Sequence, residues 1–387
     1  MFNNFFQKTP LAWRQLMKEK IRLAVAIAGI TFADLLMFVQ LGLLDALYDS
    51  ATNPHRKLQA DLVIVNRQVE TLIDMSSFPK TRLEQAPAYE GIESVAPVYL
   101  EFTDWRNPNT HLKKNILIWG FNPVDSIFIL PEVEQNAGQL QMLNRVMFDR
   151  ASRPEYGPIP QLFVEQGTLE AQVDDRLVQT VGLFKMGASF GADGNLIASD
   201  NTFFNIKGDR NSEQVDIGLI KLTPDANIET VREQLEVGLP DDVKVLTIPE
   251  FIQLEVGYWA NQGTGFIFQL GVFVGFLVGV IIVYQILHSN ISEHLPEYAT
   301  LKAMGYSDRY LLTMLMQEAL ILAVLAFLPA FLLSLGLYQI TYAATLLDIS
   351  MKTGRAVIVL LLTILMCGTS GAIAVNKLRS ADPADIF

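Results

Sequence analysis

Apolar residues gather in four long runs that contain almost no charge, one near the start of the chain and three in its last third. About 20 apolar residues in a helix are enough to cross the hydrocarbon core of a bilayer. The pattern therefore predicts four transmembrane helices in a one-plus-three arrangement. We place them at residues 23–47, 261–287, 311–340 and 356–376.

Residues 48–260 follow a different pattern, because short apolar runs of strand length are separated there by Pro, Gly and Asn. Near the end of this interval we expect a strand at 217–222, a helix at 228–237 and a strand at 243–246. The middle, about 106–214, has weaker periodicity and a Pro-rich patch, which indicates a second, mostly β subdomain inserted into the first.

Composition supports a division of the chain between lipid and water. Half of the residues are hydrophobic and 18% are charged, against about a quarter charged in an average globular chain. Residues 48–260 hold 31 acidic residues against 18 Lys and Arg, which accounts for the whole net charge of −12. The predicted fold class is an α+β membrane protein: four transmembrane helices with a large extracytoplasmic α+β domain of two subdomains inserted between helices 1 and 2.

Basic residues in short flanks resist translocation and so predict the orientation. The leader 1–22 carries five Lys and Arg against one acid, so we expect it in the cytoplasm. It is either an amphipathic helix on the membrane surface or a solvated basic flank. Four crossings return the tail 377–387 to the cytoplasm and place the short loop 341–355 outside, although Lys352 and Arg355 oppose that placement.

Motifs for chemistry are few. Residues 187–191 fit the G-x-S-x-G hydrolase elbow, but a turn follows the serine instead of a helix, so a glycine-rich turn is favoured. The His and Cys residues have no metal-ligand spacing, and the sequence contains no G-x-x-x-x-G-K-[ST] phosphate loop. The acidic balance excludes a nucleic-acid binder. We therefore expect no catalysis, metal or cofactor, with any ATP bound by another chain.

Two features stand out inside the predicted membrane helices. Gly271, Gly275 and Gly279 repeat every four residues and predict a face for close helix packing, within the chain or against a second copy. Asp34 lies near the middle of the first span, where a carboxylate is costly unless it is paired, protonated or turned toward protein. It is a functional candidate or a structural acid, and Thr363, Thr369 and Ser370 are its candidate partners.

The segment 288–310 connects the second and third spans on the predicted cytoplasmic side. Pro296 suits a first helical position, Glu297 suits the positive end of the helix dipole, and Gly305 suits the C-terminal cap. Together they predict a helix of about two turns. Four of its residues would form a compact surface facing the cytoplasm: Tyr298, Leu301, Lys302 and Met304.

Residues 297–305 read Glu-Tyr-Ala-Thr-Leu-Lys-Ala-Met-Gly, which resembles the coupling helix of the FtsX-like and MacB-like ABC permeases. The one-plus-three layout, the large outside insert and the Asp-Pro-Ala-Asp ending at 382–385 agree with that family. The stretches 11–16 and 29–42 look most like the cyanobacterial DevC permeases. One departure is 293–296, Glu-His-Leu-Pro, where many relatives have a basic lead-in.

The resemblance implies a non-catalytic, homodimeric permease in the bacterial inner membrane, with both termini cytoplasmic and the large domain periplasmic. A DevA-like ATPase would act on the coupling helix through Glu297, Tyr298, Leu301, Lys302, Met304 and Gly305. A DevB-like adaptor and a TolC-like outer-membrane channel would complete a tripartite exporter of glycolipid or another lipid. The alternative is an FtsX-type signalling scaffold that activates a periplasmic cell-wall hydrolase. The external domain discriminates, since it would bind an adaptor in one case and a hydrolase in the other.

Overall fold

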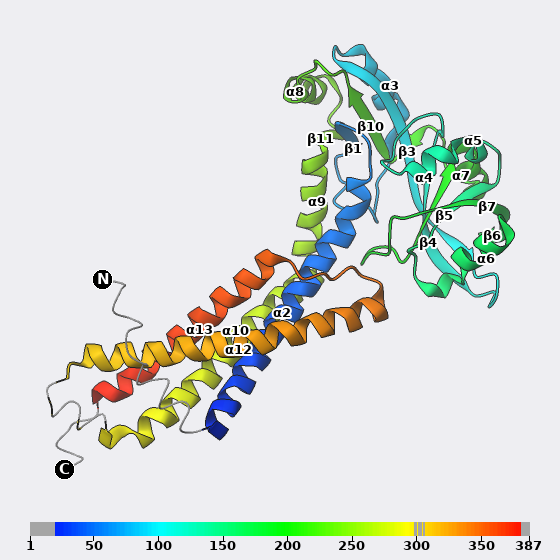
Figure 1. The fold of residues 1–387 in the computed structure, drawn as a ribbon. Helices are drawn as coiled ribbons and strands as arrows, with labels where there is room; N and C mark the ends of the chain where they lie inside the picture. The colour runs from blue at the N-terminus through cyan, green and yellow to red at the C-terminus, as the bar shows by residue number, and fades with distance from the viewer. Residues whose placement is uncertain (1–19, 298–299, 301–303, 305, 381–387) are drawn as a thin grey trace. The chain divides into compact units, whose positions relative to one another are not determined.

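The computed structural model describes residues 20–297, 300, 304 and 306–380. They divide into two compact units (Figure 1). The first, which we call the helical unit, comprises the described residues up to Asp45, Thr264–Ala344 and those from Ile349 onward. The second, which we call the domain, comprises Ala46–Gly263 and Thr345–Asp348.

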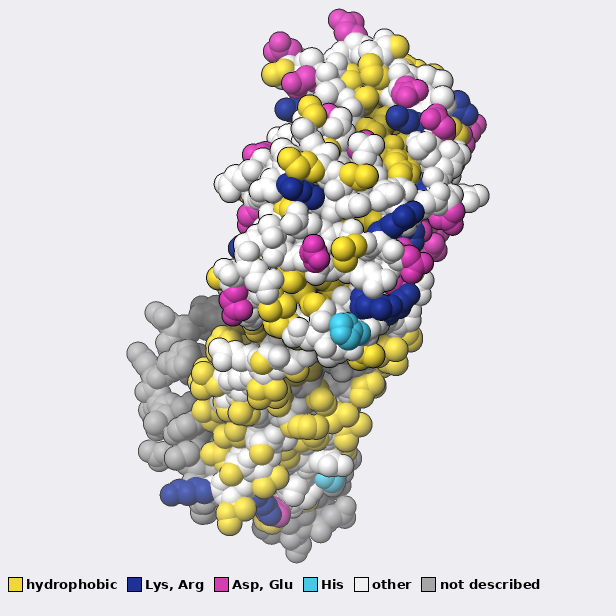
Figure 2. Space-filling model, turned by 90° about the vertical axis from the view of Figure 1, so that its right-hand side faces the viewer, with side chains coloured by type: hydrophobic (Ala, Val, Ile, Leu, Met, Phe, Trp, Pro, Cys, Tyr) yellow, Lys and Arg dark blue, Asp and Glu magenta, His cyan; other side chains and the backbone are white. Residues whose placement is uncertain are grey.

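Four helices in the described part of the chain are long and apolar enough to cross a membrane, as the hydrophobic pattern predicts. Helix α2 is longer than its predicted span and contributes residues to both units. Apolar side chains cover much of the outer surface of the helices, whereas charged side chains are spread over the domain (Figure 2). The bounds are α2 Lys20–Arg56, α10 Gly263–Glu293, α12 Asp308–Thr345 and α13 Thr353–Ser380.

The domain is built on a sheet with the strand order β11-β1-β10-β3-β4-β8-β5-β7-β6. Strand β6 also pairs with β3, so the strands from β3 to β6 in this order close into a ring, which we call the barrel. Its bounds are β3 Ile92–Arg106, β4 Lys113–Phe121, β5 Arg145–Asp149, β6 Leu169–Val173, β7 Arg176–Phe184 and β8 Asn195–Ser199. The other strands are β1 Leu62–Asn66, β10 Ile217–Leu222 and β11 Val243–Thr247, with a small pair of β2 Phe78–Pro79 and β9 Gln214–Val215.

Strand β3 belongs to both halves of the domain. Its first part pairs with β10, and its second part, from Val98 to Arg106, pairs with β4. The expected subdomain 106–214 thus takes its first strand from residues before 106. Strand β3 can pair with both neighbours because β10 lies along one of its edges and β4 along the other.

Helices cover both faces of the sheet. The amphipathic α8 (Ile228–Gly238) buries Val231 and Leu235 in the same core as Ile64 and Ile220. Helix α9 (Ile248–Asn261) begins with a capping box at Thr247 and buries Phe251 in the core of the opposite face. The expected strand, helix and strand at 217–246 are present as β10, α8 and β11.

Shorter helices complete the domain, and buried aromatic side chains contribute to its core. Trp105 donates a hydrogen bond from Nε1 to the carbonyl of Tyr156 at 3.1 Å, and both side chains are fully buried. The shorter elements are α3 Lys80–Gln85, η1 Ala86–Ala88, α4 Pro131–Gln135, α5 Ala137–Leu140, η2 Pro154–Tyr156, α6 Ile159–Gln166 and α7 Asp200–Ile206.

Candidate functional site

The predicted coupling helix is described only in part. Tyr298, Leu301, Lys302 and Gly305 lie outside the described residues. Around them, the Thr300 hydroxyl donates to the Pro296 carbonyl at 2.8 Å, and the Met304 amide donates to the Thr300 carbonyl at 3.0 Å. Both bonds span four residues, as in an α-helix. Glu297 and Met304 are exposed, so their side chains are open to a partner.

A charged pair links the start of this connector to the first helix. Arg22 of α2 donates two hydrogen bonds to the carboxylate of Glu293, the last residue of α10. Both side chains are nearly half exposed, so solvent screens the pair. The acidic Glu293 is thus paired with a positive charge from α2.

Asp34 is fully buried in the helical unit. The Oγ1 atom of Thr363 in α13 lies 2.8 Å from Asp34 Oδ1 and also 2.8 Å from the Val359 carbonyl. Of the other two expected partners, Thr369 bonds within its own helix and Ser370 bonds to the carbonyl of Val280. The structure therefore brings Asp34 together with Thr363 and not with Thr369 or Ser370.

The glycine face of α10 packs within the same chain. A Cβ atom added at Gly275 would lie 3.2 Å from Met37 Cγ of α2. One added at Gly279 would overlap the sulfur of Met366 in α13 and lie 3.0 Å from the Cβ of Ala33. Gly271 faces the side-chain amide of Gln40 in the same way. The three glycines thus permit the close approach of α10 to its neighbours.

Arg355, whose charge opposes the predicted placement of its loop, is paired. Its Nε and Nη2 atoms donate to Asp45 Oδ2 at 3.0 and 2.5 Å, and its Nη1 donates to the Ser350 carbonyl at 3.1 Å. Its guanidinium lies 5.2 Å from the ring centroid of Tyr338, whose hydroxyl donates to the Phe38 carbonyl at 2.5 Å. This group ties α2, α12 and α13 together. The sequence analysis did not identify it, although Asp45 is an acid at the end of the first predicted span.

A second buried polar group lies in the domain, where the last turn of α2 meets α9. The Glu255 carboxylate accepts hydrogen bonds from Thr71 Oγ1 at 2.9 Å, the Leu72 amide at 2.8 Å and Trp259 Nε1 at 2.7 Å. His55 Nε2 lies 3.6 Å from Glu255 Oε2. Burial raises the pKa of Glu255, and the three hydrogen bonds oppose that rise. We call His55 and Glu255 the buried pair; sequence reasoning missed it because nothing local links the two residues.

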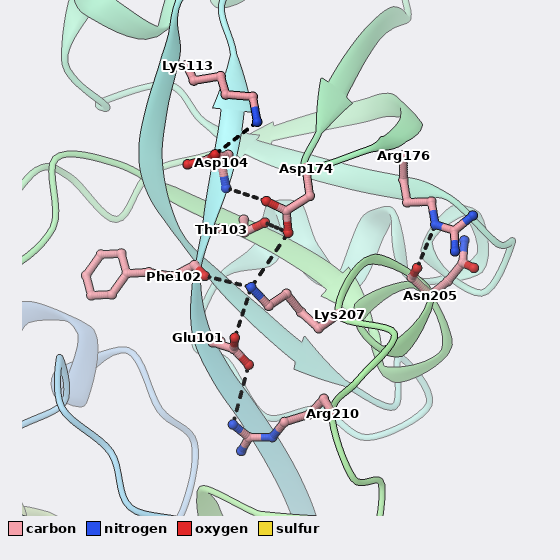
Figure 3. Close-up of polar contacts among 10 residues, drawn as sticks. All are labelled: Glu101, Phe102, Thr103, Asp104, Lys113, Asp174, Arg176, Asn205, Lys207 and Arg210. Atoms are coloured by element: carbon pink, nitrogen blue, oxygen red, sulfur yellow. Dashed lines mark hydrogen bonds and ion pairs between the residues drawn. The ribbon is translucent and has the colours of Figure 1, made fainter.

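The largest charged network of the domain lies along one edge of β3 (Figure 3). Lys207 contacts Glu101 at 2.9 Å and donates to the Phe102 carbonyl at 3.1 Å. Asp174 accepts from the Asp104 amide at 3.0 Å, and Asp216 accepts from the Leu100 amide at 2.8 Å. Between the part of β3 that pairs with β10 and the part that pairs with β6, backbone groups along this edge of β3 thus bond to side chains and not to another strand. We call Glu101, Asp174, Lys207, Arg210 and Asp216 the seam cluster.

The G-x-S-x-G segment forms a turn. Ser189 Oγ accepts hydrogen bonds from the amides of Gly191 and Ala192 at 3.1 and 2.9 Å. The adjacent hollow has a volume of about 10 Å³, which is room for one water at most. No hydrogen bond joins Ser189 to a histidine in the described part of the chain. Among the described residues, no group of three or more His, Cys, Asp or Glu is placed to hold a metal ion.

Residues 270–383 match the model of the FtsX-like permease C-terminal domain. The chain is also similar to the periplasmic region of MacB from Actinobacillus actinomycetemcomitans, at 14% identity over 50% of this chain and 92% of that one, with a TM-score of 0.34. It is similar to the extracellular domain of the noncanonic ABC-type transporter YknZ from Gram-positive bacteria, at 12% identity over 49% and 99%, with a TM-score of 0.33.

A third similar structure is a domain of a putative permease protein from Porphyromonas gingivalis, at 13% identity over 49% of this chain and 87% of that one, with a TM-score of 0.30. No curated protein matches the chain. The match covers most of α10, the connector, α12 and α13, so the last part of the chain is similar to the FtsX-like permease C-terminal domain.

Proposed function

We propose that this protein is the permease subunit of an ABC exporter of the MacB-like type, driven by an ATPase on a separate chain. The observation that carries the proposal is the FtsX-like permease match over residues 270–383, which includes the connector at 288–310. These 387 residues contain no nucleotide phosphate loop, so in this proposal a partner binds and hydrolyses the ATP.

The connector is the proposed point of entry. Glu297 and Met304 are exposed and belong to the proposed ATPase contact, and Tyr298, Leu301 and Lys302 lie between them in the sequence. The pair of Arg22 and Glu293 passes a displacement of the connector directly to α2. An α-helix resists bending, and α2 has 37 residues, about 55 Å at 1.5 Å per residue. Motion along α2 would therefore do work in the domain without chemistry in this chain.

The finer assignment follows from the resemblance to the DevC permeases. We propose a homodimer in the bacterial inner membrane, with both termini in the cytoplasm and the domain in the periplasm. There a DevB-like adaptor and a TolC-like outer-membrane channel would complete a tripartite exporter. Glycolipid or another lipid is the proposed cargo, since four helices per copy are few for an enclosed aqueous path.

Purification of the full chain from its native membrane in mild detergent tests the proposal. We expect an ABC ATPase and a periplasmic adaptor among the bound proteins. The variants Leu301→Glu and Met304→Glu should each lose the bound ATPase, because a carboxylate in an apolar contact must be desolvated. Met142→Glu is the matched control, since Met142 is an exposed methionine of the domain, like Met304 of the connector.

Three results would contradict the proposal. The first is nucleotide hydrolysis by the purified chain without partners. The second is unchanged ATPase binding by both connector variants. The third is a cell-wall hydrolase in place of the adaptor, which would support the signalling scaffold and overturn export.

A further inference from the structure

Two segments of the domain meet at the buried pair. The last turn of α2 carries His55, and α9 carries Glu255. The side chain of His55 is fully buried and that of Glu255 is 3% exposed. The ring of His55 packs edge-on against Phe251 of α9, with centroids 4.4 Å apart. Two titratable side chains thus face each other out of water, one from each helix.

These two helices contact different parts of the domain. The residues that directly follow α2 pair with the segment after β4: the Gln59 amide donates to the Ile127 carbonyl and the Ile129 amide to the Lys57 carbonyl, both at 2.8 Å. Helix α9 instead follows the edge strand β11 and packs on the sheet. The buried pair therefore joins two helices with different contacts: α2 leads into the segment that pairs with residues 127–129, and α9 packs on the sheet.

The two side chains of the buried pair do not share a hydrogen bond, and one added proton would allow them to form one. Glu255 Oε2 accepts from the Leu72 amide, but its 3.6 Å separation from His55 Nε2 exceeds hydrogen-bond distance. An ionised carboxylate facing a neutral ring has an acceptor but no donor if the ring proton is on Nδ1. One added proton on Glu255 Oε2 would supply the donor and allow a neutral hydrogen bond to His55 Nε2.

The surroundings favour uptake of that proton as the pH falls. Burial raises the pKa of Glu255 even though three donors bond to its ionised form. Burial lowers the pKa of His55 to about 3, the hydrogen bond to the Ala51 backbone opposes this lowering, and the charge of Arg56 adds to it, so Glu255 and not His55 takes up the proton. The 71–72 segment presents a neutral hydroxyl and a neutral amide.

We propose that the buried pair is a proton-operated contact, which binds one proton on acidification and then draws the last turn of α2 against α9. The inference concerns residues of the domain and does not rest on the proposed export function. Burial raises the pKa of Glu255, so its contribution to stability is present at low pH and is lost as the pH rises through its folded-state pKa. Burial lowers the pKa of His55, so its contribution has the opposite sign: it is present at higher pH and is lost as the pH falls through its folded-state pKa.

Trp259 supplies a reporter for the test, because its indole Nε1 donates to Glu255 Oε1 at 2.7 Å. The full chain in phosphatidylcholine nanodiscs is titrated from pH about 8 to about 4 while the tryptophan emission is recorded. We expect one shift of the emission, absent in Trp259→Phe. Glu255→Gln removes the titrating carboxyl, so its emission should be the same at both ends of the titration.

The variant His55→Phe tests whether the proton is shared between Glu255 and His55 or is held by Glu255 alone. It keeps the aromatic packing and removes the ring acceptor, so the midpoint of the titration should move to lower pH. His111→Asn is the matched control: His111 is the other histidine of residues 48–260, is exposed, and has a positive φ that Asn tolerates. Its midpoint should equal that of the unmodified chain.

Amide hydrogen exchange tests the movement. After correction for intrinsic rates, the amides of α9 should be more protected at the acidic end in the unmodified chain, whereas their protection should be equal at both ends in Glu255→Gln. An unmoved midpoint in His55→Phe, or equal protection at both ends in the unmodified chain, would overturn the proposal. If Glu255→Gln does not fold, the His55→Phe midpoint and the exchange of the unmodified chain decide in the same way.

Discussion

Buried charges are held differently in the helical unit and in the domain. In the helical unit each lies in a small group that joins two or three helices, as Arg355 does with Asp45 and Asp34 does with Thr363. In the domain a buried carboxylate has several donors: Asp149 accepts from Asn195 and from three backbone amides. Removing the one strong partner of a buried group should therefore cost most of its stabilisation, whereas removing one of several donors should cost only part of it.

The largest effect should follow from Asp45→Ala. It leaves the guanidinium of Arg355, which is 3% exposed, without its carboxylate. Breaking a buried ion pair from one side costs about 3–5 kcal/mol, and we expect the lower end because Asp45 is about a third exposed. Unfolding of the full chain in detergent micelles measures the loss.

The double variant Asp45→Ala with Arg355→Met is the control for that prediction. It removes both charges and keeps an apolar side chain of similar length at 355, so most of the stability should return. An unfolding midpoint of Asp45→Ala equal to that of the unmodified chain would show that this group of three helices does not depend on its ion pair.

Gly279→Ala tests the close packing of α10 at a smaller scale. The new methyl group would overlap Met366 and press on Ala33, so we expect a loss of about 1–3 kcal/mol from overpacking. Gly336→Ala is the matched control in α12, because no atom lies within 4 Å of the added Cβ there. That variant should be neutral or gain up to about 1 kcal/mol from helix propensity. Equal stabilities for the two variants would remove the packing role of Gly279.

Local sequence patterns predicted the helices and strands, but contacts between residues far apart in the sequence could not be predicted. The four apolar helices and the order β10, α8, β11 follow from runs and alternations within about 20 residues of sequence. The closure of the barrel through β3 and β6 depends on residues 70 apart, such as Asp104 and Asp174. The bond of Arg355 to Asp45 spans 310 residues. In the sequence, Arg355 was only a charge that opposed the expected orientation.

Lys207→Met should have a moderate effect on the domain. Lys207 is 16% exposed, and its ammonium bonds to Glu101 and to the Phe102 carbonyl (Figure 3). The pairs with Glu101 and Asp174 raise its pKa against the lowering by burial, so the side chain is a cation throughout the neutral range. Losing a hydrogen-bonded charge of this kind costs about 1.5–3 kcal/mol. Thermal unfolding followed through the domain tryptophans measures it.

Lys113→Met is the control for Lys207→Met, because it removes a lysine of the same domain that lies in an exposed ion pair. Lys113 pairs with Asp104 at 3.2 Å across β3 and β4, two strands that already share a ladder, and it is nearly half exposed. A surface pair of this kind contributes about 0–1 kcal/mol. If Lys113→Met costs as much as Lys207→Met, the seam cluster does not replace a missing strand.

The smallest effect should come from Asp34→Asn. Thr363 has one hydroxyl proton for two acceptors, Asp34 Oδ1 and the Val359 carbonyl, so a donor at position 34 satisfies both when Thr363 donates to Val359. The amide of Asn supplies that donor, and interhelical hydrogen bonds in membranes average only about 0.6 kcal/mol. Asp34→Leu removes the bond and should cost about that much. Both variants should therefore assemble, and under the proposed function an assay of ATP-driven export in reconstituted vesicles separates the two roles. Export retained in both would mark Asp34 as structural, whereas export lost in Asp34→Asn with unchanged stability would require the ionisable group itself.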